Sequence, residues 1–228
     1  MLIGGLQKFS LIDYPGKISA IIFTQGCNFR CPYCHNPELV EPALFQRAMS
    51  SKKIFSFLEK RKGKIDAVVV TGGEPTLQKD LLNFIRKIKN MGYLVKLDTN
   101  GSNPNIIENM IDKKLVDYIA MDIKAPLQKY EEIVRAEIDT KKIEKSIDLI
   151  MESGIDYEFR TTLIKSLLST EDVLNIGKTI QGAKRYILQK FIPSKTLDRE
   201  FLASTFSTDD FKFLHKKLGS YIVECIIR

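Results

Sequence analysis

No apolar run in this sequence reaches the roughly 18 residues that a membrane-spanning helix requires. The opening stretch, MLIGGLQKFSLIDYPGK, also lacks the charged start, apolar segment and small-residue cleavage site of a signal peptide. We therefore expect a cytoplasmic protein that makes no contact with a membrane.

Cysteine is scarce, because the chain of 228 residues contains only Cys27, Cys31, Cys34 and Cys225. Three of the four lie within eight residues, which excludes a disulfide framework spread over the fold. In a reducing cytosol, clustered thiols favour metal binding or redox catalysis. Cys225 lies apart, in the alternating stretch YIVECII, and we expect it to be a small buried apolar residue.

A stripe of basic residues is also missing, although 35 basic and 28 acidic residues give a net charge of +7. The basic residues are mixed with acids, as in EKRKGK and DTKKIEK. A nucleic-acid-binding protein needs a clustered basic surface or a recognisable binding module, and we find neither, so we expect no nucleic-acid partner. The charge fits a solvated, lysine-rich surface, and the alternative is a basic rim that faces an acidic partner.

What is present is the composition of one ordinary globular domain, 44% hydrophobic and 28% charged. The periodicity of the apolar residues predicts alternating strands and helices. Strands are expected over residues 18–24, 66–72, 93–99, 116–123, 155–163, 185–191 and 220–227. Helices are expected over residues 45–61, 77–92, 103–114, 140–154, 169–180 and 207–219. Alternation at this spacing favours parallel βαβ units, and therefore an α/β fold of six or seven strands.

Polar and reactive residues follow the predicted strands in turn. The cysteine loop follows the first strand, GGEP the second, DTNG the third and DIKAP the fourth, and RTT ends the fifth. Right-handed crossovers place the carboxyl ends of parallel strands on one face, where functional loops gather. We therefore expect these segments to meet at one rim of the sheet.

The stretch CNFRCPYCH at the first of these loops fits several kinds of site. Within it, CPYC resembles the redox pair of a glutaredoxin, although that smaller fold leaves Cys27 unexplained. CPYCH fits the attachment pattern of a c-type haem, which requires an oxidising compartment. A structural zinc needs four ligands, so Cys34 and its neighbour His35 would both have to bind, or Cys225 would have to join from afar.

An iron–sulfur cluster is the remaining alternative for this stretch. A [4Fe–4S] cluster normally takes four thiolates. The spacing Cys27-x-x-x-Cys31-x-x-Cys34 supplies three from one short loop, which leaves one iron without a protein thiolate and able to bind a ligand.

The pattern Cys-x-x-x-Cys-x-aromatic-Cys, formed by Cys27, Cys31, Tyr33 and Cys34, resembles the signature of the radical S-adenosylmethionine (SAM) enzymes. The GGEP of residues 72–75 resembles their second motif, which contacts the methionine amine. The resemblance implies a partial (β/α)6, TIM-like barrel. We expect residues 1–228 to form a single such domain, with residues 1–17 as an N-terminal extension that packs on the barrel.

The stretch DYPGKISAIIFTQGCNFRCPYCHNPEL resembles, more narrowly, the N-terminal block of the glycyl-radical-enzyme activating proteins. The likeness is greatest to activators of anaerobic ribonucleoside-triphosphate reductase, and it extends over VTGGEPTLQ, LDTNG, YIAMDIKAP and FRTT. It implies a [4Fe–4S] cluster that cleaves SAM to a 5′-deoxyadenosyl radical, which takes a hydrogen atom from a glycine of the partner enzyme. A flavodoxin- or ferredoxin-type protein would supply the electron.

Three alternatives to activation of this reductase stay open. The first is activation of a pyruvate formate-lyase-like enzyme. The second is a small-molecule radical enzyme, such as a 7-carboxy-7-deazaguanine synthase-like protein, which would need a closed pocket. The third is a zinc-binding or thiol-redox module without radical chemistry.

The resemblance assigns expected roles to the residues of the first two loops. Cys27, Cys31 and Cys34 would ligate the cluster, and Tyr33 would lie beside the adenine, unless it only packs at the barrel mouth. Gly72 and Gly73 would let the backbone approach the ligand, with Glu74 as the acidic member of a turn. The alternative for this second loop is a tight turn before a helix. His35 is expected to hydrogen-bond near the cluster.

Further residues are expected to complete the site. Asp98, Thr99 and Asn100 could hydrogen-bond the ribose or bind a cation. Asp122 and Lys124 are two residues apart and share a strand face, so Lys124 could pair with the ligand carboxylate or form a salt bridge near Asp122. The resemblance suggests a monovalent cation at Asp98, Thr99 and Asp122. Arg160 would serve the ligand, pair with Glu74, or form a structural ion pair.

Overall fold

The computed structural model describes every residue, Met1–Arg228, and its centre is a single sheet of eight strands. The strands follow chain order across the sheet: β1 Ile3–Ser10, β2 Ser19–Thr24, β3 Ala67–Gly72, β4 Leu94–Thr99, β5 Tyr118–Asp122, β6 Asp156–Leu163, β7 Arg185–Lys190 and β8 Glu224–Ile227. Each pair from β2·β3 to β7·β8 is parallel. The predicted α/β fold is therefore confirmed.

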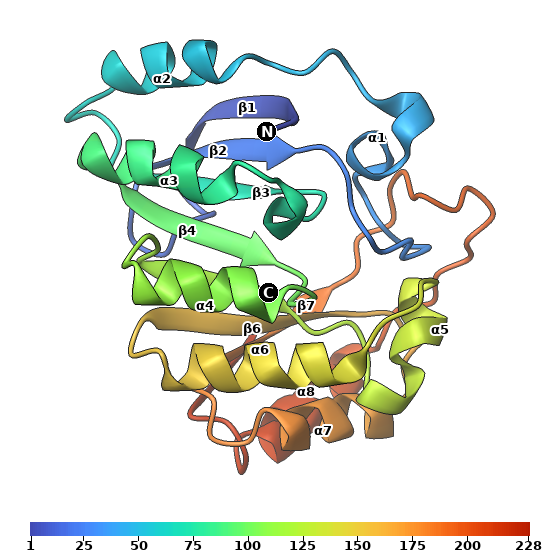
Figure 1. Cartoon of the computed structure of the whole chain (residues 1–228). Coiled ribbons are helices and arrows are strands. Elements are labelled where there is room, and N and C mark those ends of the chain that lie inside the picture. The colour runs from blue at the N-terminus through green and yellow to red at the C-terminus, as the bar shows by residue number, and fades with distance from the viewer.

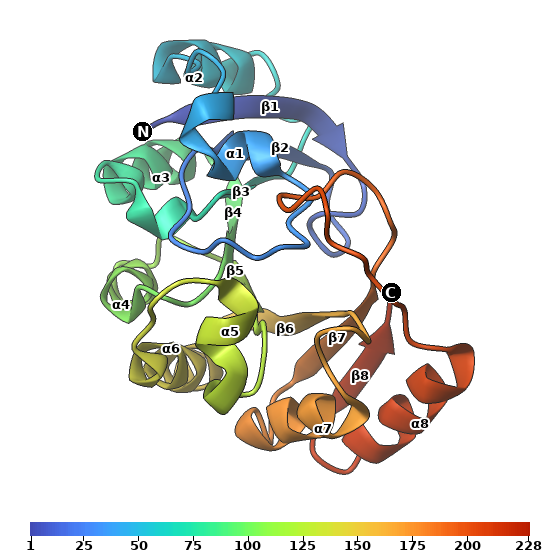
Figure 2. The same cartoon turned by 90° about the vertical axis from the view of Figure 1, so that its right-hand side faces the viewer.

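The sheet curls into an open barrel with helices on its outer side (Figure 1). The helices are α1 Pro37–Val40, α2 Ser51–Glu59, α3 Leu81–Asn90, α4 Pro104–Asp112, α5 Tyr130–Val134, α6 Thr140–Glu152, α7 Thr170–Thr179 and α8 Thr208–Leu218. Figure 2 shows β1 and β8 at the two ends of the curled sheet. Because these two strands do not pair, the barrel is open along one side. No helix combines the length and the apolar character needed to cross a membrane.

Strand β1 was not predicted from the sequence. Its residues, IGGLQKFS, show neither a steady alternation nor a run of β-branched residues, and they form a strand by pairing antiparallel with β2. The following turn folds over the amino ends of the parallel strands. There the ring centroid of Tyr14 lies 5.6 Å from that of Tyr118, and Lys96 Nζ donates to the carbonyl oxygen of Asp13 at 2.6 Å.

The predicted helix over residues 45–61 is shorter in the structure. It begins at Ser51, where Ser50 caps it by accepting a hydrogen bond from the backbone of Lys53. Residues 45–50 are not helical, and Met49 instead forms a bridge to Ile3. The tertiary contact with β1 therefore replaces the first part of the predicted helix.

Alternation along each strand separates the core from the barrel interior. In β5, Ile119 and Met121 belong to the large core under the helices, whereas Tyr118 and Ala120 belong to a small apolar cluster on the opposite face. The polar Asp122 ends the strand on this inner face, which is how the fold carries charged groups to the barrel mouth.

Candidate functional site

A cavity of about 280 Å³ lies at the carboxyl ends of strands β2 to β7. Every residue that the sequence nominated for the site lines it: Cys27, Cys31, Tyr33, Cys34, Gly72, Gly73, Glu74, Asp98, Thr99, Asn100, Asp122, Lys124 and Arg160. The predicted convergence of the loops on one rim therefore agrees with the structure. Cys225, on β8, is not part of the lining.

Thr162 and Gln189 also line the cavity; the sequence placed Thr162 at the rim only as part of RTT, without a role, and did not predict Gln189. Strand register could have found both. Thr162 lies two residues beyond Arg160 on the same face of β6, and Gln189 of β7 is its partner across the sheet.

The cysteine loop is held by backbone hydrogen bonds from both sides. The amide of Arg30 donates to the carbonyl of Val134, and on the other side Leu197 N and Asp198 N donate to the carbonyls of Cys34 and Pro32. These bonds fix a loop that has no regular structure of its own. The thiol of Cys27 additionally accepts a hydrogen bond from Phe29 N at 3.4 Å.

Burial favours the protonated form of all three thiols when nothing is bound to them. Burial raises the pKa of Cys27 to about 12 and that of Cys31 to about 11, and it also raises the pKa of Cys34. A metal takes cysteine as the thiolate, so binding at this loop must release the protons.

The donor set fits an iron–sulfur cluster better than a single metal ion. A structural zinc needs four ligands, and Cys225 does not line the cavity that Cys27, Cys31 and Cys34 share. A cubane cluster instead spreads its thiolates over different irons, so three sulfurs around a cavity suit it and leave one iron for another ligand. His35 lines the same cavity, and its buried Nε2 atom has no hydrogen-bond partner.

The two glycines of GGEP are required by close backbone contacts. Gly72 has φ of +116°, and a Cβ there would lie 2.3 Å from Thr24 N. A Cβ on Gly73 would lie 2.1 Å from the carbonyl oxygen of Gly26. Because these glycines have no side chains, the backbone of Glu74 can approach the start of the cysteine loop. Glu74 N donates to Gly26 O at 2.8 Å.

Gly73→Ala is expected to lower the free energy of unfolding by about 1–3 kcal/mol, the typical cost of overpacking a closely packed site. The neighbour it would strike is backbone, which cannot turn away as a side chain can. Urea unfolding of the variant measures the loss. Gly219→Ala is the matched control, since its Cβ would meet only ordinary contacts of 3.6 and 3.7 Å. Equal stability of the two variants would contradict the close approach.

Glu74 is 1% exposed, and its carboxylate faces the protein's own loops. It accepts hydrogen bonds from Thr76 N at 3.0 Å, Thr76 Oγ1 at 2.5 Å, Thr99 Oγ1 at 2.8 Å and Asn100 N at 2.7 Å. Burial raises its pKa, and these four donors lower it in part. The side chain therefore ties the loop after β3 to the loop after β4.

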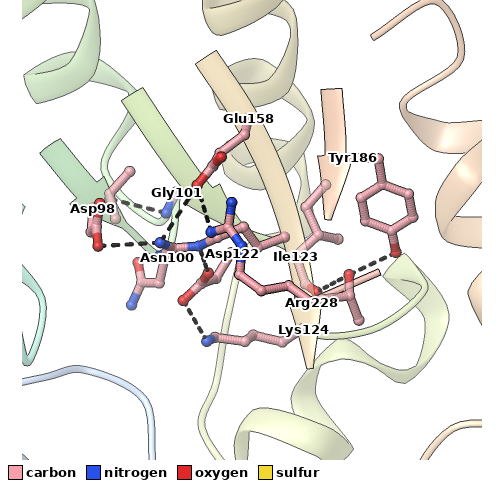
Figure 3. Close-up of polar contacts among 12 residues, drawn as sticks. Asp98, Asn100, Gly101, Asp122, Ile123, Lys124, Glu158, Tyr186 and Arg228 are labelled. Atoms are coloured by element: carbon pink, nitrogen blue, oxygen red, sulfur yellow. Dashed lines mark hydrogen bonds and ion pairs between the residues drawn. The ribbon is translucent and has the colours of Figure 1, made fainter. Parts of the chain in front are cut away.

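Arg160 pairs with aspartates and not with Glu74. Its Nε donates to Asp122 Oδ1 at 2.7 Å and its Nη1 to Asp98 Oδ2 at 3.2 Å. Lys124 Nζ donates to Asp122 Oδ2 at 3.0 Å (Figure 3). Although burial alone would raise it, Arg160 and Lys124 hold the pKa of Asp122 well below its usual range.

Two of the three residues predicted to bind a monovalent cation, Asp98 and Asp122, form ion pairs with basic side chains. Asp122 is paired with Arg160 and Lys124, and Asp98 Oδ1 lies 3.2 Å from Lys96 Nζ. The third, Thr99, donates its hydroxyl to Glu74. A cation at this place would have to share these carboxylates with the basic side chains.

The aromatic side chains of the cysteine loop pack against the segment that follows β7. The ring of Tyr33 is 7% exposed and its centroid lies 6.5 Å from that of Phe201. The ring of His35 lies 5.0 Å from Phe191. The structure thus shows the packing role of Tyr33, and its place in the cavity lining leaves it beside any molecule that binds there.

Comparison with known proteins agrees with this geometry. The family model of the Radical SAM superfamily matches residues 21–175. A protein of Methanocaldococcus jannaschii, provisionally named a glycyl-radical enzyme activating enzyme, is 38% identical over 100% of this chain and 95% of its own length. The pyruvate formate-lyase-activating enzyme of Streptococcus mutans is 27% identical over 86% of this chain and 78% of its own.

Solved structures share the fold at low sequence identity. Streptococcus suis SuiB, crystallised with S-adenosylmethionine, superposes with a TM-score of 0.72 at 14% identity. The match covers 91% of this chain and 49% of SuiB, so the chain spans about half the length of that protein.

Proposed function

The chain belongs to the radical SAM superfamily and is a homologue of glycyl-radical-enzyme activating enzymes, and from this premise we propose that it installs a glycyl radical on a partner enzyme. The family implies a [4Fe–4S] cluster and SAM. The observation that carries the proposal is the single cavity that the three cysteines share with the GGEP loop and the ends of β4, β5 and β6.

When bound, the cluster would supply the electron that cleaves SAM to the 5′-deoxyadenosyl radical, which takes a hydrogen atom from a glycine. Cys27, Cys31 and Cys34 would hold it and leave one iron for the amine and carboxylate of SAM. Lys124 is suited to bind the SAM carboxylate, because its ammonium group has three hydrogens and donates one hydrogen bond, to Asp122.

The loop of residues 72–74 would bind the amine through its backbone carbonyl oxygens, since the carboxylate of Glu74 already accepts four hydrogen bonds. Tyr33 would stack beside the adenine. Asp98 would reach the ribose, whereas the side chain of Asn100 is engaged by neighbouring residues. A monovalent cation at Asp98, Thr99 and Asp122 stays part of the proposal, and it would share the two carboxylates with Lys96, Lys124 and Arg160.

We propose anaerobic ribonucleoside-triphosphate reductase as the partner and a flavodoxin- or ferredoxin-type protein as the electron donor. The partner choice rests on the start GLQKFSLIDYPGK. The sheet does not close between β1 and β8, and in this proposal a glycine-bearing loop of a macromolecular substrate would enter the barrel from that side. A pyruvate formate-lyase-like partner is the second candidate, favoured by the similarity to the Streptococcus mutans enzyme.

Glycyl-radical formation is the test of this proposal. The anaerobically reconstituted protein is mixed with SAM, a reductant and either candidate enzyme, and electron paramagnetic resonance records the radical. We expect a glycyl-radical doublet with the reductase. A doublet only with pyruvate formate-lyase would replace the partner, and no radical with either enzyme, despite SAM cleavage, would favour a small-molecule substrate.

A further inference from the structure

Asn100 lies at the centre of a polar network that joins two loops of the cavity, and the network fixes which way its amide points. Ser102 N donates to Asn100 Oδ1 at 3.0 Å, and a backbone amide can only donate. The oxygen of the side chain is therefore on that side, and its NH₂ group faces the cysteine loop. Asn100 is 6% exposed, so water does not compete for these groups.

The rest of the network agrees with this orientation. Asn100 Nδ2 donates to Asn28 Oδ1 at 3.0 Å, Asn28 Nδ2 donates to Ser102 Oγ at 3.0 Å, and Ser102 Oγ donates to Asn100 Oδ1 at 2.7 Å. The three side chains form a closed ring in which each of the three bonds joins a donor to an acceptor. A flipped amide at Asn100 would place two donors face to face at Ser102 N.

One hydrogen of the Asn100 NH₂ group remains after the bond to Asn28, and a sulfur atom lies within reach of it. Asn100 Nδ2 lies 4.0 Å from Cys27 Sγ, at the long end of the range for a bond to sulfur. The other polar donor to this sulfur is Phe29 N of the same loop. Cys27 thus receives a side-chain donor from a different element, the loop that follows β4.

Glu74 holds Asn100 in this position from behind. Its carboxylate accepts the backbone amide of Asn100 at 2.7 Å, and through Thr99 it fixes the preceding residue as well. A movement of the GGEP loop would therefore move the donor that faces Cys27.

We propose that Asn100 is a positioning residue for the cluster: its side-chain amide donates to the sulfur of Cys27, and Glu74 holds it there. This inference rests on the proposed function, because it assumes that Cys27 ligates a cluster. A hydrogen bond to a ligating sulfur stabilises the more negatively charged, reduced cluster and raises its potential. Glu74 then has two roles: it holds Asn100 toward the cluster, and it belongs to the loop of residues 72–74 that would bind the SAM amine.

Two variants remove the donor in different ways. Asn100→Asp keeps the oxygen that accepts from Ser102 but has no N–H groups, and Asn100→Leu has a similar shape without a charge. Each is reconstituted anaerobically, its iron and sulfide are assayed, and its midpoint potential is followed by spectroelectrochemistry. We expect both to show a potential more negative than the wild type, or to bind less iron while melting at the wild-type temperature.

Asn103→Leu is the matched control, because Asn103 lies on the same loop but donates to Thr76 Oγ1 and not to a sulfur. Its potential is expected to equal that of the wild type. Wild-type potential and iron content in both Asn100 variants would overturn the inference, and if one variant fails to fold the other decides. Failure of the wild type itself to take up iron would instead refute the proposed function.

Discussion

Cys31→Ala is expected to abolish both stable cluster binding and SAM cleavage. Cys31 is one of three thiols in the cavity and is itself buried, so no neighbouring thiol or solvent can replace it as a ligand. With two thiolates left, the loop would hold the cluster on two irons only. Iron and sulfide assays after reconstitution, followed by chromatography of 5′-deoxyadenosine, measure the two losses.

Cys225→Ala is the matched control for that variant. Cys225 lies on β8, outside the cavity, and burial raises its pKa to about 11, as expected for an inert thiol. We expect the variant to retain the cluster and the cleavage of SAM. Loss of the cluster in Cys225→Ala at unchanged thermal stability would show that the three-ligand assignment is wrong.

Arg160→Met is expected to lower the free energy of unfolding by about 3 kcal/mol, the lower end of the range for breaking a buried ion pair. The Arg160 side chain is 13% exposed and bonds both Asp122 and Asp98. Lys124 and Lys96 still serve these carboxylates, which is why the loss is not larger. Arg160→Lys keeps the charge without the fork of donors, and we expect an intermediate loss.

Urea unfolding measures these differences, with Arg135→Met as the surface control. Arg135 is 52% exposed in its pair with Asp198, so its loss should cost about 0–1 kcal/mol. Because the pKa of Asp122 is depressed in the folded protein, the pair contributes above the unfolded pKa near 4 and is lost as the pH falls. The free energies of unfolding of the wild type and Arg160→Met, measured as a function of pH, should therefore converge in acid. Equal losses in Arg160→Met and Arg135→Met at pH 7 would contradict the buried network.

The parallel strands could be predicted because they are buried on both faces. AVVVTG and YIAMD are apolar runs that end in polar or glycine residues, and each is a strand in the structure. β1 could not be predicted, because its strand conformation depends on pairing with β2 and its sequence contains two glycines. The short helices α1 and α5 have too few residues to show a period.

The membership of the candidate site could be predicted from topology, but its internal contacts could not. Residues at the carboxyl ends of parallel strands must meet, and Glu74, Asp122 and Arg160 do line one cavity. Which partner each charge takes depends on side-chain directions that a linear sequence does not contain. Arg160 therefore joins Asp122, its neighbour across the sheet, while Glu74 accepts from the Asn100 amide and the Thr99 hydroxyl of the next loop.

The spectrum of the reduced, reconstituted protein with and without SAM tests the central claim, that three thiols leave one iron open for SAM. We predict a brown protein with about four irons per chain, whose paramagnetic resonance spectrum changes when SAM is added. A colourless protein that binds zinc, or a cluster whose spectrum SAM leaves unchanged, would contradict the account.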